Sequence, residues 1–275
     1  MIPLNMDVIR RQFLHGLTLL ELLVVIAILG VLAALTLGAV GRAKGKATNI
    51  KCASNLRQLT QAWLLYADEH QGRLPSVFYY HSNQLNVAQG SVNTNAWVRG
   101  SMDDDTRVYV PVQPGVPDSI NLAGLRLGTL FRYVGSEALY RCPADKSSVN
   151  GTPRVRSYSI NGWMGGTWVL GQSNYVVFQR LDEVDTPSRR WVFIDEHERS
   201  INDGWFAVDM VGRRGLLDVP STRHGDAYAL GFADGHTELF KIEDGRTKAF
   251  TRRPIPNAPL NPDWKRLSEV TTYGQ

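Results

Sequence analysis

The sequence predicts an α+β fold in which one long N-terminal helix packs against an antiparallel β-sheet domain. Three observations lead to this prediction. An apolar run fills residues 17–40, and a stripe of apolar residues at helical spacing extends it to about residue 70. From Arg154 onward, short segments rich in aromatic and β-branched residues alternate with turn residues.

The composition is that of a folded protein. Of the 275 residues, 43% are hydrophobic and 20% are charged, which is enough apolar material for a core and excludes wholesale disorder. The 30 Lys and Arg residues exceed the 26 Asp and Glu residues only slightly, and they are scattered along the chain. We therefore expect no nucleic-acid partner.

The first element is a predicted transmembrane helix over residues 17–40. As a helix it is about 36 Å long, against about 30 Å for the hydrocarbon core of a bilayer. A secretory signal peptide would have a shorter apolar core and a small-residue cleavage site after it. The run is therefore expected to stay in the mature protein as a single-pass anchor, preceded by a leader over residues 1–16.

Glu21 is the only charged residue in this run. A carboxylate at that depth costs a few kcal/mol. Either the side chain reaches the membrane interface, or it awaits a positive partner, such as a free α-amine produced by cleavage nearby.

The segment from Gly16 to Ala27, GLTLLELLVVIA, resembles the N-terminal signature of type IV prepilins and type II secretion pseudopilins. The resemblance implies that a prepilin peptidase cuts after Gly16 and that the new N-terminus, Leu17, is methylated. Leu17 stands where phenylalanine is commonest in that family. In a filament, Glu21 of one subunit would neutralise the Leu17 ammonium of its neighbour, which would fix the axial register.

The resemblance also implies a pilin-like fold and a location. The protein would lie in the inner membrane with its C-terminal domain extracytoplasmic, and it would enter a filament in the periplasm or at the cell surface. Its partners would be the prepilin peptidase, other pilin-like subunits and an inner-membrane assembly platform. A Lys and Arg count alone predicts the opposite orientation, since the leader has Arg10 and Arg11 whereas the far flank has four basic residues.

The helix is expected to continue beyond the membrane as an amphipathic segment over residues 41–71. Its apolar stripe recurs at steps of three and four and consists of Cys52, Leu56, Leu59, Trp63 and Tyr66. The spacing predicts one helix from about Leu17 to about His70, ended by Gly72 and Pro75.

The remainder, residues 72–275, is predicted to be a β-rich domain that begins with loops and short strands over 76–128. The candidate strands are Arg154–Ile160, Tyr175–Arg180, Trp191–Glu196, Trp205–Asp209, Ala227–Phe232 and Thr237–Ile242. Asp234-Gly235 between the last two predicts a tight hairpin. The tail after Lys248 is rich in proline and is expected to be irregular.

Cys52 and Cys142 are the only cysteines. Both would lie outside the cytoplasm, where disulfides persist, so we expect a bridge between them. Closing a loop of that length is worth about 4–5 kcal/mol on the chain-entropy estimate. Two buried free thiols are the alternative.

Residues 224–235 resemble the H-X9-DG segment found near the C-terminus of one large class of prepilin-like proteins, in which its role is not established. The residues themselves favour a structural role, in which Gly235 allows the turn, Asp234 accepts turn amides and His224 braces a strand. The alternative is a metal site, because the ligand types are suitable. Its candidates are His224, Asp226, Asp234 and His236, with Asp195 or His197 as additions. The triplet Asp103–Asp105 is expected to be a solvated loop, and a Ca²⁺ contact is the alternative, although the spaced acids of an EF-hand loop are missing from it.

No enzymatic motif is evident, since G-x-S-x-G, H-E-x-x-H and phosphate-binding glycine loops are all missing from the sequence. The acidic run 195–198 is expected to be an exposed strand end. The predicted function is that of a non-enzymatic filament subunit of a type IV pilus or a type II secretion pseudopilus. The alternative is a membrane-anchored domain that binds a glycan or a metal through residues 195–236 and uses the prepilin signal only for display.

Overall fold

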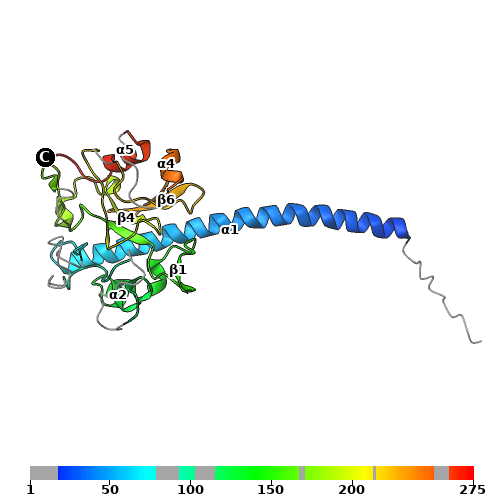
Figure 1. Ribbon diagram of the computed structural model, residues 1–275, viewed down its shortest axis with the longest axis horizontal. Coiled ribbons are helices and arrows are strands. Elements are labelled where there is room, and N and C mark those ends of the chain that lie inside the picture. The colour runs from blue at the N-terminus through cyan, green and yellow to red at the C-terminus, as the bar shows by residue number, and fades with distance from the viewer. Residues whose placement is uncertain (1–17, 79–92, 103–114, 167–170, 213–214, 251–259) are drawn as a thin grey trace, which may run out of the picture. The chain divides into compact units, whose positions relative to one another are not determined.

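The computed structural model describes residues 18–78, 93–102, 115–166, 171–212, 215–250 and 260–275. The chain divides into two compact units, residues 1–46 and residues 47–275. The boundary between them falls inside helix α1 (Figure 1).

Helix α1 runs from Leu19 to Glu69, which confirms the long helix predicted for Leu17 to His70. It is long and apolar enough over its first part to cross a membrane. Within the first unit, the large apolar side chains of α1 from Leu19 to Val40 are exposed. At its other end, Gly72 takes a positive φ of 82° and its amide donates to the Ala67 carbonyl, which ends the helix.

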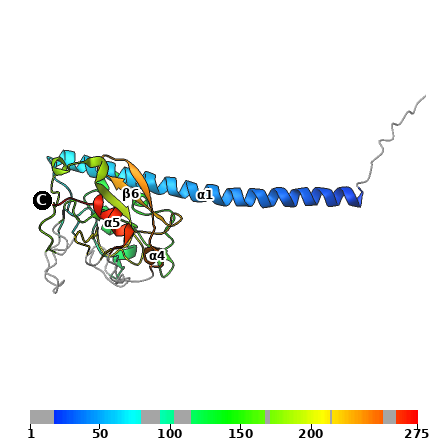
Figure 2. The ribbon, with the colours of Figure 1, turned by 90° about the horizontal axis from the view of Figure 1, so that it is seen from above.

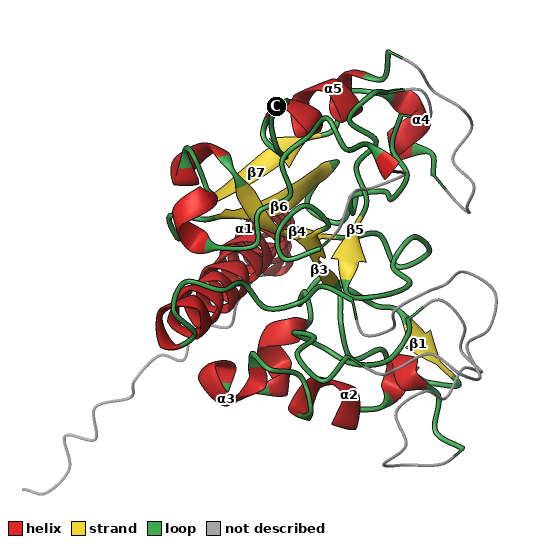
Figure 3. Ribbon diagram, turned by 90° about the vertical axis from the view of Figure 1, so that its left-hand side faces the viewer, coloured by secondary structure: helices red, strands yellow, loops and turns green. Residues whose placement is uncertain are grey.

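The second unit is built on a five-stranded sheet with the order β5-β3-β4-β6-β7 (Figure 3). The strands are β3 (Tyr158–Asn161), β4 (Trp191–Asp195), β5 (Trp205–Phe206), β6 (Ala227–Phe232) and β7 (Thr237–Lys241). The hairpin of β6 and β7 is confirmed: Ala227 pairs with Lys241, Gly231 pairs with Thr237, and Gly235 in the turn has a φ of 92°. The predicted antiparallel sheet is correct for these strands and for β3-β4 and β4-β6.

Two predictions for the sheet are wrong. The edge strand β5 pairs with β3 in parallel, because the chain leaves β4 and crosses β3 before it pairs. The segment Tyr175–Arg180 is not a strand; it forms isolated bridges to Gly274, Met164 and Arg73, so its backbone bonds to separate loops.

The sheet separates two apolar cores. One core lies between the sheet and α1 and includes Leu56, Leu59 and Trp63 of the predicted stripe. The other core lies on the opposite face, where Leu230 and Phe240 are clustered with Leu267 of helix α5 (Pro262–Glu269). Figure 2 shows α1 passing close to β6 within this unit.

Small residues in β6 let α1 come close to the sheet. Residues alternate between the two faces of a strand, and Ala229 faces the α1 side while Tyr228 and Leu230 face the other core. Gly231 is a point of close approach, since a Cβ there would lie 2.7 Å from Thr60 Oγ1 of α1. A side chain at this position would push the helix away from the sheet.

The tail contains helix α5, which corrects the prediction of an irregular segment after Lys248. Asn261 caps it by accepting hydrogen bonds from the amides of Asp263 and Trp264, and Pro262 occupies the first helical position. Proline is favoured at this position, because it needs no amide partner there and its φ suits the helix.

Short helices and turns make up most of the remaining described chain. The predicted loops and short strands of 76–128 contain short helices instead of strands within the described residues, where the extended contact is the bridge from Ser76 to Ala96. The short elements are η1 (Asp118–Ile120), α2 (Ala123–Arg126), α3 (Phe131–Val134), η2 (Glu137–Tyr140), β1 (Ser148–Val149), β2 (Thr152–Pro153), η4 (Leu181–Glu183), η5 (Pro187–Arg189) and α4 (Gly245–Lys248).

Candidate functional site

The described residues begin at Thr18, so they include the part of the N-terminal signal from Thr18 onward. The Glu21 carboxylate accepts hydrogen bonds from the Thr18 amide at 2.8 Å and from the Thr18 hydroxyl at 2.9 Å. The Thr18 hydroxyl in turn accepts from the Glu21 amide at 3.2 Å. This is a capping box, which satisfies free amides at the start of α1. Gly16 and Leu17 lie outside the described residues, as does the acidic triplet 103–105.

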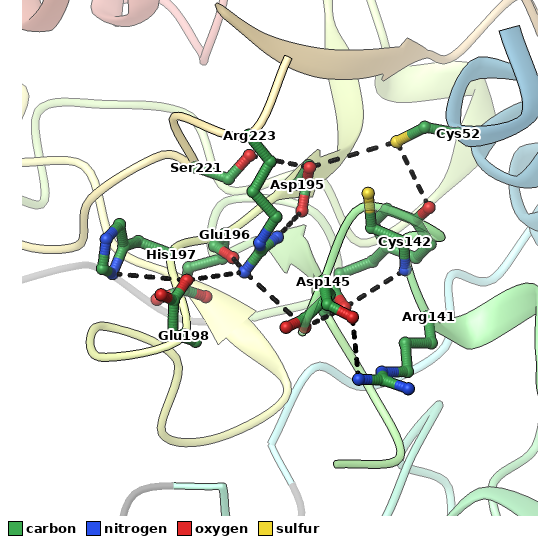
Figure 4. Close-up of polar contacts among 12 residues, drawn as sticks. Cys52, Arg141, Cys142, Asp145, Asp195, Glu196, His197, Glu198, Ser221 and Arg223 are labelled. Carbon is green, nitrogen blue, oxygen red and sulfur yellow. Dashed lines mark hydrogen bonds and ion pairs between the residues drawn. The ribbon is translucent and has the colours of Figure 1, made fainter. Parts of the chain in front are cut away.

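The second candidate site is a buried cluster in the second unit formed by Cys52, Cys142, Asp195 and His224. One potential ligand atom from each residue lies within 4.8 Å of the others. Figure 4 shows the region, with Cys52 coming from α1 and Asp195 from the end of β4. We call these four residues the thiol–histidine cluster.

A tight turn brings two side chains to Asp195. The turn lies at residues 223–226, before β6, and Gly225 and Asp226 both have positive φ values. As a result, Arg223 and His224 both contact the Asp195 carboxylate. The Arg223 guanidinium contacts Oδ1 of Asp195, and Nε2 of His224 lies 3.1 Å from Oδ2. Ser221 donates a further hydrogen bond to Oδ2 at 2.7 Å.

Arg223 joins this carboxylate to a wider ionic network. Its guanidinium lies 3.6 Å from Asp145 and 3.1 Å from Glu198 (Figure 4). The side chains of Asp195 and Arg223 are both buried, so each charge depends on the other for compensation.

The two cysteine sulfur atoms have different neighbours: one lies near His224 and the other near Asp195. Cys142 Sγ is 3.4 Å from His224 Nε2, and Cys52 Sγ is 4.0 Å from Asp195 Oδ2. Tyr158 of β3 donates its hydroxyl hydrogen to Cys52 Sγ at 3.3 Å. Both cysteines are buried free thiols, so the predicted disulfide is not formed in this structure and the bridge stays a prediction.

The orientation of His224 is set by α1. Its Nδ1 lies 2.8 Å from Asn49 Oδ1. An amide oxygen only accepts, so Nδ1 carries a hydrogen and donates to it. Nε2 is thereby directed at Asp195 and Cys142. The structure thus supports the interpretation of His224 as a residue that braces the fold, but it contacts α1 and β4 in addition to the strand that it precedes.

The cluster perturbs the protonation of its members. The hydrogen bond from Cys52 lowers the pKa of Cys142 to about 6 despite burial. Burial opposes the charged form of His224, but hydrogen bonds to Asp195 and Cys142 raise its pKa to about 9. Hydrogen bonding to Cys142, together with burial, raises the pKa of Cys52. These shifts favour a thiolate at Cys142 and a protonated imidazole at His224, whose Sγ and Nε2 lie 3.4 Å apart.

The predicted metal ligands do not come together as a set. Asp226 is exposed and lies 3.7 Å from Lys248 Nζ, while the Asp234 carboxylate accepts from the His236 amide at 3.0 Å in the exposed hairpin turn. The reason is geometric: β6 lies between His224 and Asp234 and carries them to opposite ends of a strand. Of the two possible additions, Asp195 belongs to the cluster and His197 does not.

The prediction of an exposed strand end at residues 195–198 is also wrong. Asp195 and Glu196 are fully buried. Glu196 accepts hydrogen bonds from Ser159 at 2.6 Å and from Ser200 at 2.8 Å, which makes its burial tolerable. Ser200 is only four residues away, but Ser159 belongs to β3, and sequence reasoning could not foresee that pairing between strands brings it to Glu196.

Sequence reasoning also missed the role of Arg223 and Asn49. Arg223 stands next to His224, and Asn49 stands three residues before Cys52, on the same face of the helix. These sequence positions place Arg223 beside His224 and Asn49 beside Cys52. They point to a shared site only once β6 is known to lie against α1.

Residues 15–37 match a family described as the prokaryotic N-terminal methylation motif. Together with the long apolar helix that follows, this match shows that the chain carries a prepilin-type signal. Comparison with curated proteins found no match, and neither did comparison with solved structures.

Proposed function

We propose that this protein is a pilin-like subunit that is cleaved after Gly16, methylated at Leu17 and assembled through its N-terminal helix into a pilus-like or pseudopilus filament. The observation that carries the proposal is the match of residues 15–37 to the methylation motif. Processing by a prepilin peptidase and contact with other pilin-like subunits follow from that signal.

The exposed apolar side chains in the first part of α1 support filament assembly through this helix. Its large apolar side chains include Leu22, Val25 and Ile28, and each is about half exposed. Such a surface is unfavourable in water, so it needs lipid before assembly and neighbouring helices afterwards. Anchoring in the inner membrane, with residues 47–275 extracytoplasmic, is the arrangement that serves this role.

Glu21 supports a role in assembly beyond anchoring. Its carboxylate bonds to the amide and the hydroxyl of Thr18, the residue that follows Leu17 in the sequence. A plain anchor has no need of a carboxylate among apolar residues, whereas a subunit that must pair with a neighbour's ammonium has.

The test is mass spectrometry of the N-terminus of the mature protein from its native membrane. We expect a chain that begins at N-methylated Leu17. An intact Met1 or a cut beyond Val40 would contradict the proposal, and the display of a glycan- or metal-binding domain would then be the better explanation.

A further inference from the structure

We propose that the thiol–histidine cluster is a structural zinc site, in which Cys52 Sγ, Cys142 Sγ, Asp195 Oδ2 and His224 Nε2 bind one Zn²⁺. These donors come from α1, from the segment after η2, from β4 and from the turn before β6. The inference does not depend on the proposed filament function.

The first argument is the donor set. Thiolate, imidazole and carboxylate are the groups that bind Zn²⁺ in proteins, and four protein ligands are typical of a structural site. Calcium is disfavoured, because it takes oxygen ligands in larger number.

The second argument is the geometry. Zinc bond lengths place ligand atoms at the corners of a tetrahedron about 3.3–3.8 Å apart. The Cys142 Sγ to His224 Nε2 distance is 3.4 Å, the Nε2 to Asp195 Oδ2 distance is 3.1 Å, and the Oδ2 to Cys52 Sγ distance is 4.0 Å. Shifts of a few tenths of an ångström in these three distances would bring them to tetrahedral values.

The third argument is the set of groups around the ligands. Asn49 orients the imidazole through Nδ1, Ser221 and Arg223 hold the Asp195 carboxylate, and Tyr158 donates to Cys52 Sγ. Hydrogen bonds of this kind keep metal ligands in position and are a regular feature of such sites.

The fourth argument is charge and access. Zn²⁺ and the Arg223 guanidinium, which also contacts Asp145 and Glu198, would offset the negative charge of two thiolates and the Asp195 carboxylate, with His224 neutral. The four ligand residues are buried, with exposed fractions of 0% for Cys52, 1% for Cys142, 0% for Asp195 and 5% for His224. A closed site with four protein ligands leaves no position for substrate, so its role is to join α1 to the sheet.

The rival state is a disulfide between the same two sulfurs, which would remove both thiolates. The experiment must distinguish the two states. The full-length protein is purified in detergent with a thiol reductant and without chelator, its zinc content is measured, and Zn²⁺ is then exchanged for Co²⁺. We expect one zinc per chain, and we expect the Co²⁺ form to show the visible absorption and the thiolate charge-transfer bands of a tetrahedral site.

Variants locate the metal. Cys142→Ser and His224→Gln should lose the bound zinc, whereas His236→Gln, which changes a partly exposed histidine outside the cluster, should keep one zinc per chain. Because ligand variants can fail to fold, Asn49→Ala provides a second measurement: all four ligands remain, and zinc affinity should fall by about tenfold to a hundredfold.

Two results would overturn the proposal. One is a folded, reduced wild-type protein that takes up less than stoichiometric Zn²⁺ or Co²⁺ when it is supplied. The other is protein from the native membrane that contains no zinc and has an intact mass two hydrogens below that of the dithiol, which would establish the disulfide instead.

Discussion

At the scale of single residues, two acidic side chains have opposite surroundings. Asp195 is buried and held by Arg223, His224 and Ser221, whereas Glu21 is exposed and bonds only to Thr18 among the contacts described for it. Asp195 is therefore satisfied within the fold. Glu21 has capacity left for a partner outside its own chain.

We predict that Glu21→Ala leaves membrane insertion and cleavage intact but abolishes assembly, because the neighbour's N-terminal ammonium would lose its counter-charge. Thr18→Ala is the matched control, since it removes the side-chain hydrogen bond to Glu21 and keeps the carboxylate. Filaments sheared from cells, quantified beside the membrane-bound protein, provide the measurement. Normal filament yield from Glu21→Ala would refute the role given to this charge.

At the scale of elements, the contact between α1 and β6 organises the second unit. The helix provides Cys52 and Asn49 to the cluster, and β6 follows directly from the turn that holds His224. Strand β6 separates His224 from Asp234-Gly235: the histidine precedes the strand, and the Asp-Gly pair makes the turn at the strand's other end.

We predict that Gly231→Ala destabilises the second unit by about 1–3 kcal/mol, because the added methyl group would overlap Thr60 Oγ1 of α1. Gly245→Ala is the control, since a Cβ there meets no atom within 4 Å. Thermal unfolding of the two variants measures the difference. Equal midpoints would show that α1 and β6 are not held so closely.

At the scale of the whole molecule, the two units differ in whether their apolar side chains are buried within the chain. The core beside α1 begins at Cys52, and the most apolar window of α1 is 0% buried. Residues 19–46 thus contribute no side chain to the described core of the second unit. That part of the helix is the part that we propose contacts lipid and neighbouring subunits.

We predict that a fragment of residues 47–275 folds without detergent and unfolds at nearly the same temperature as the second unit of the full-length chain. Circular dichroism during heating tests this expectation, with the full-length chain in mild detergent as the reference. A fragment that aggregates, or that lacks a cooperative transition, would show that the second unit needs the membrane helix.

The sequence by itself determined the features that arise from local pattern. The prepilin-type signal, the long helix, the apolar stripe and the Asp-Gly hairpin each occupy one continuous segment, and each follows from periodicity or from the conformational preference of a few residues. The same reasoning failed at Pro262, where proline begins a helix, and at Tyr175–Arg180, whose partners are distant loops.

Only the tertiary structure decided how the chemical groups come together. Cys52, Cys142, Asp195 and His224 are spread over more than half of the chain, and their proximity depends on the crossing of α1 over the sheet and on the order of the strands. Spacing along the sequence suggested Asp234 and His236 as companions of His224, but an extended strand separates them. Ligand geometry is a property of packing between segments, and a sequence pattern reports only on the segment that contains it.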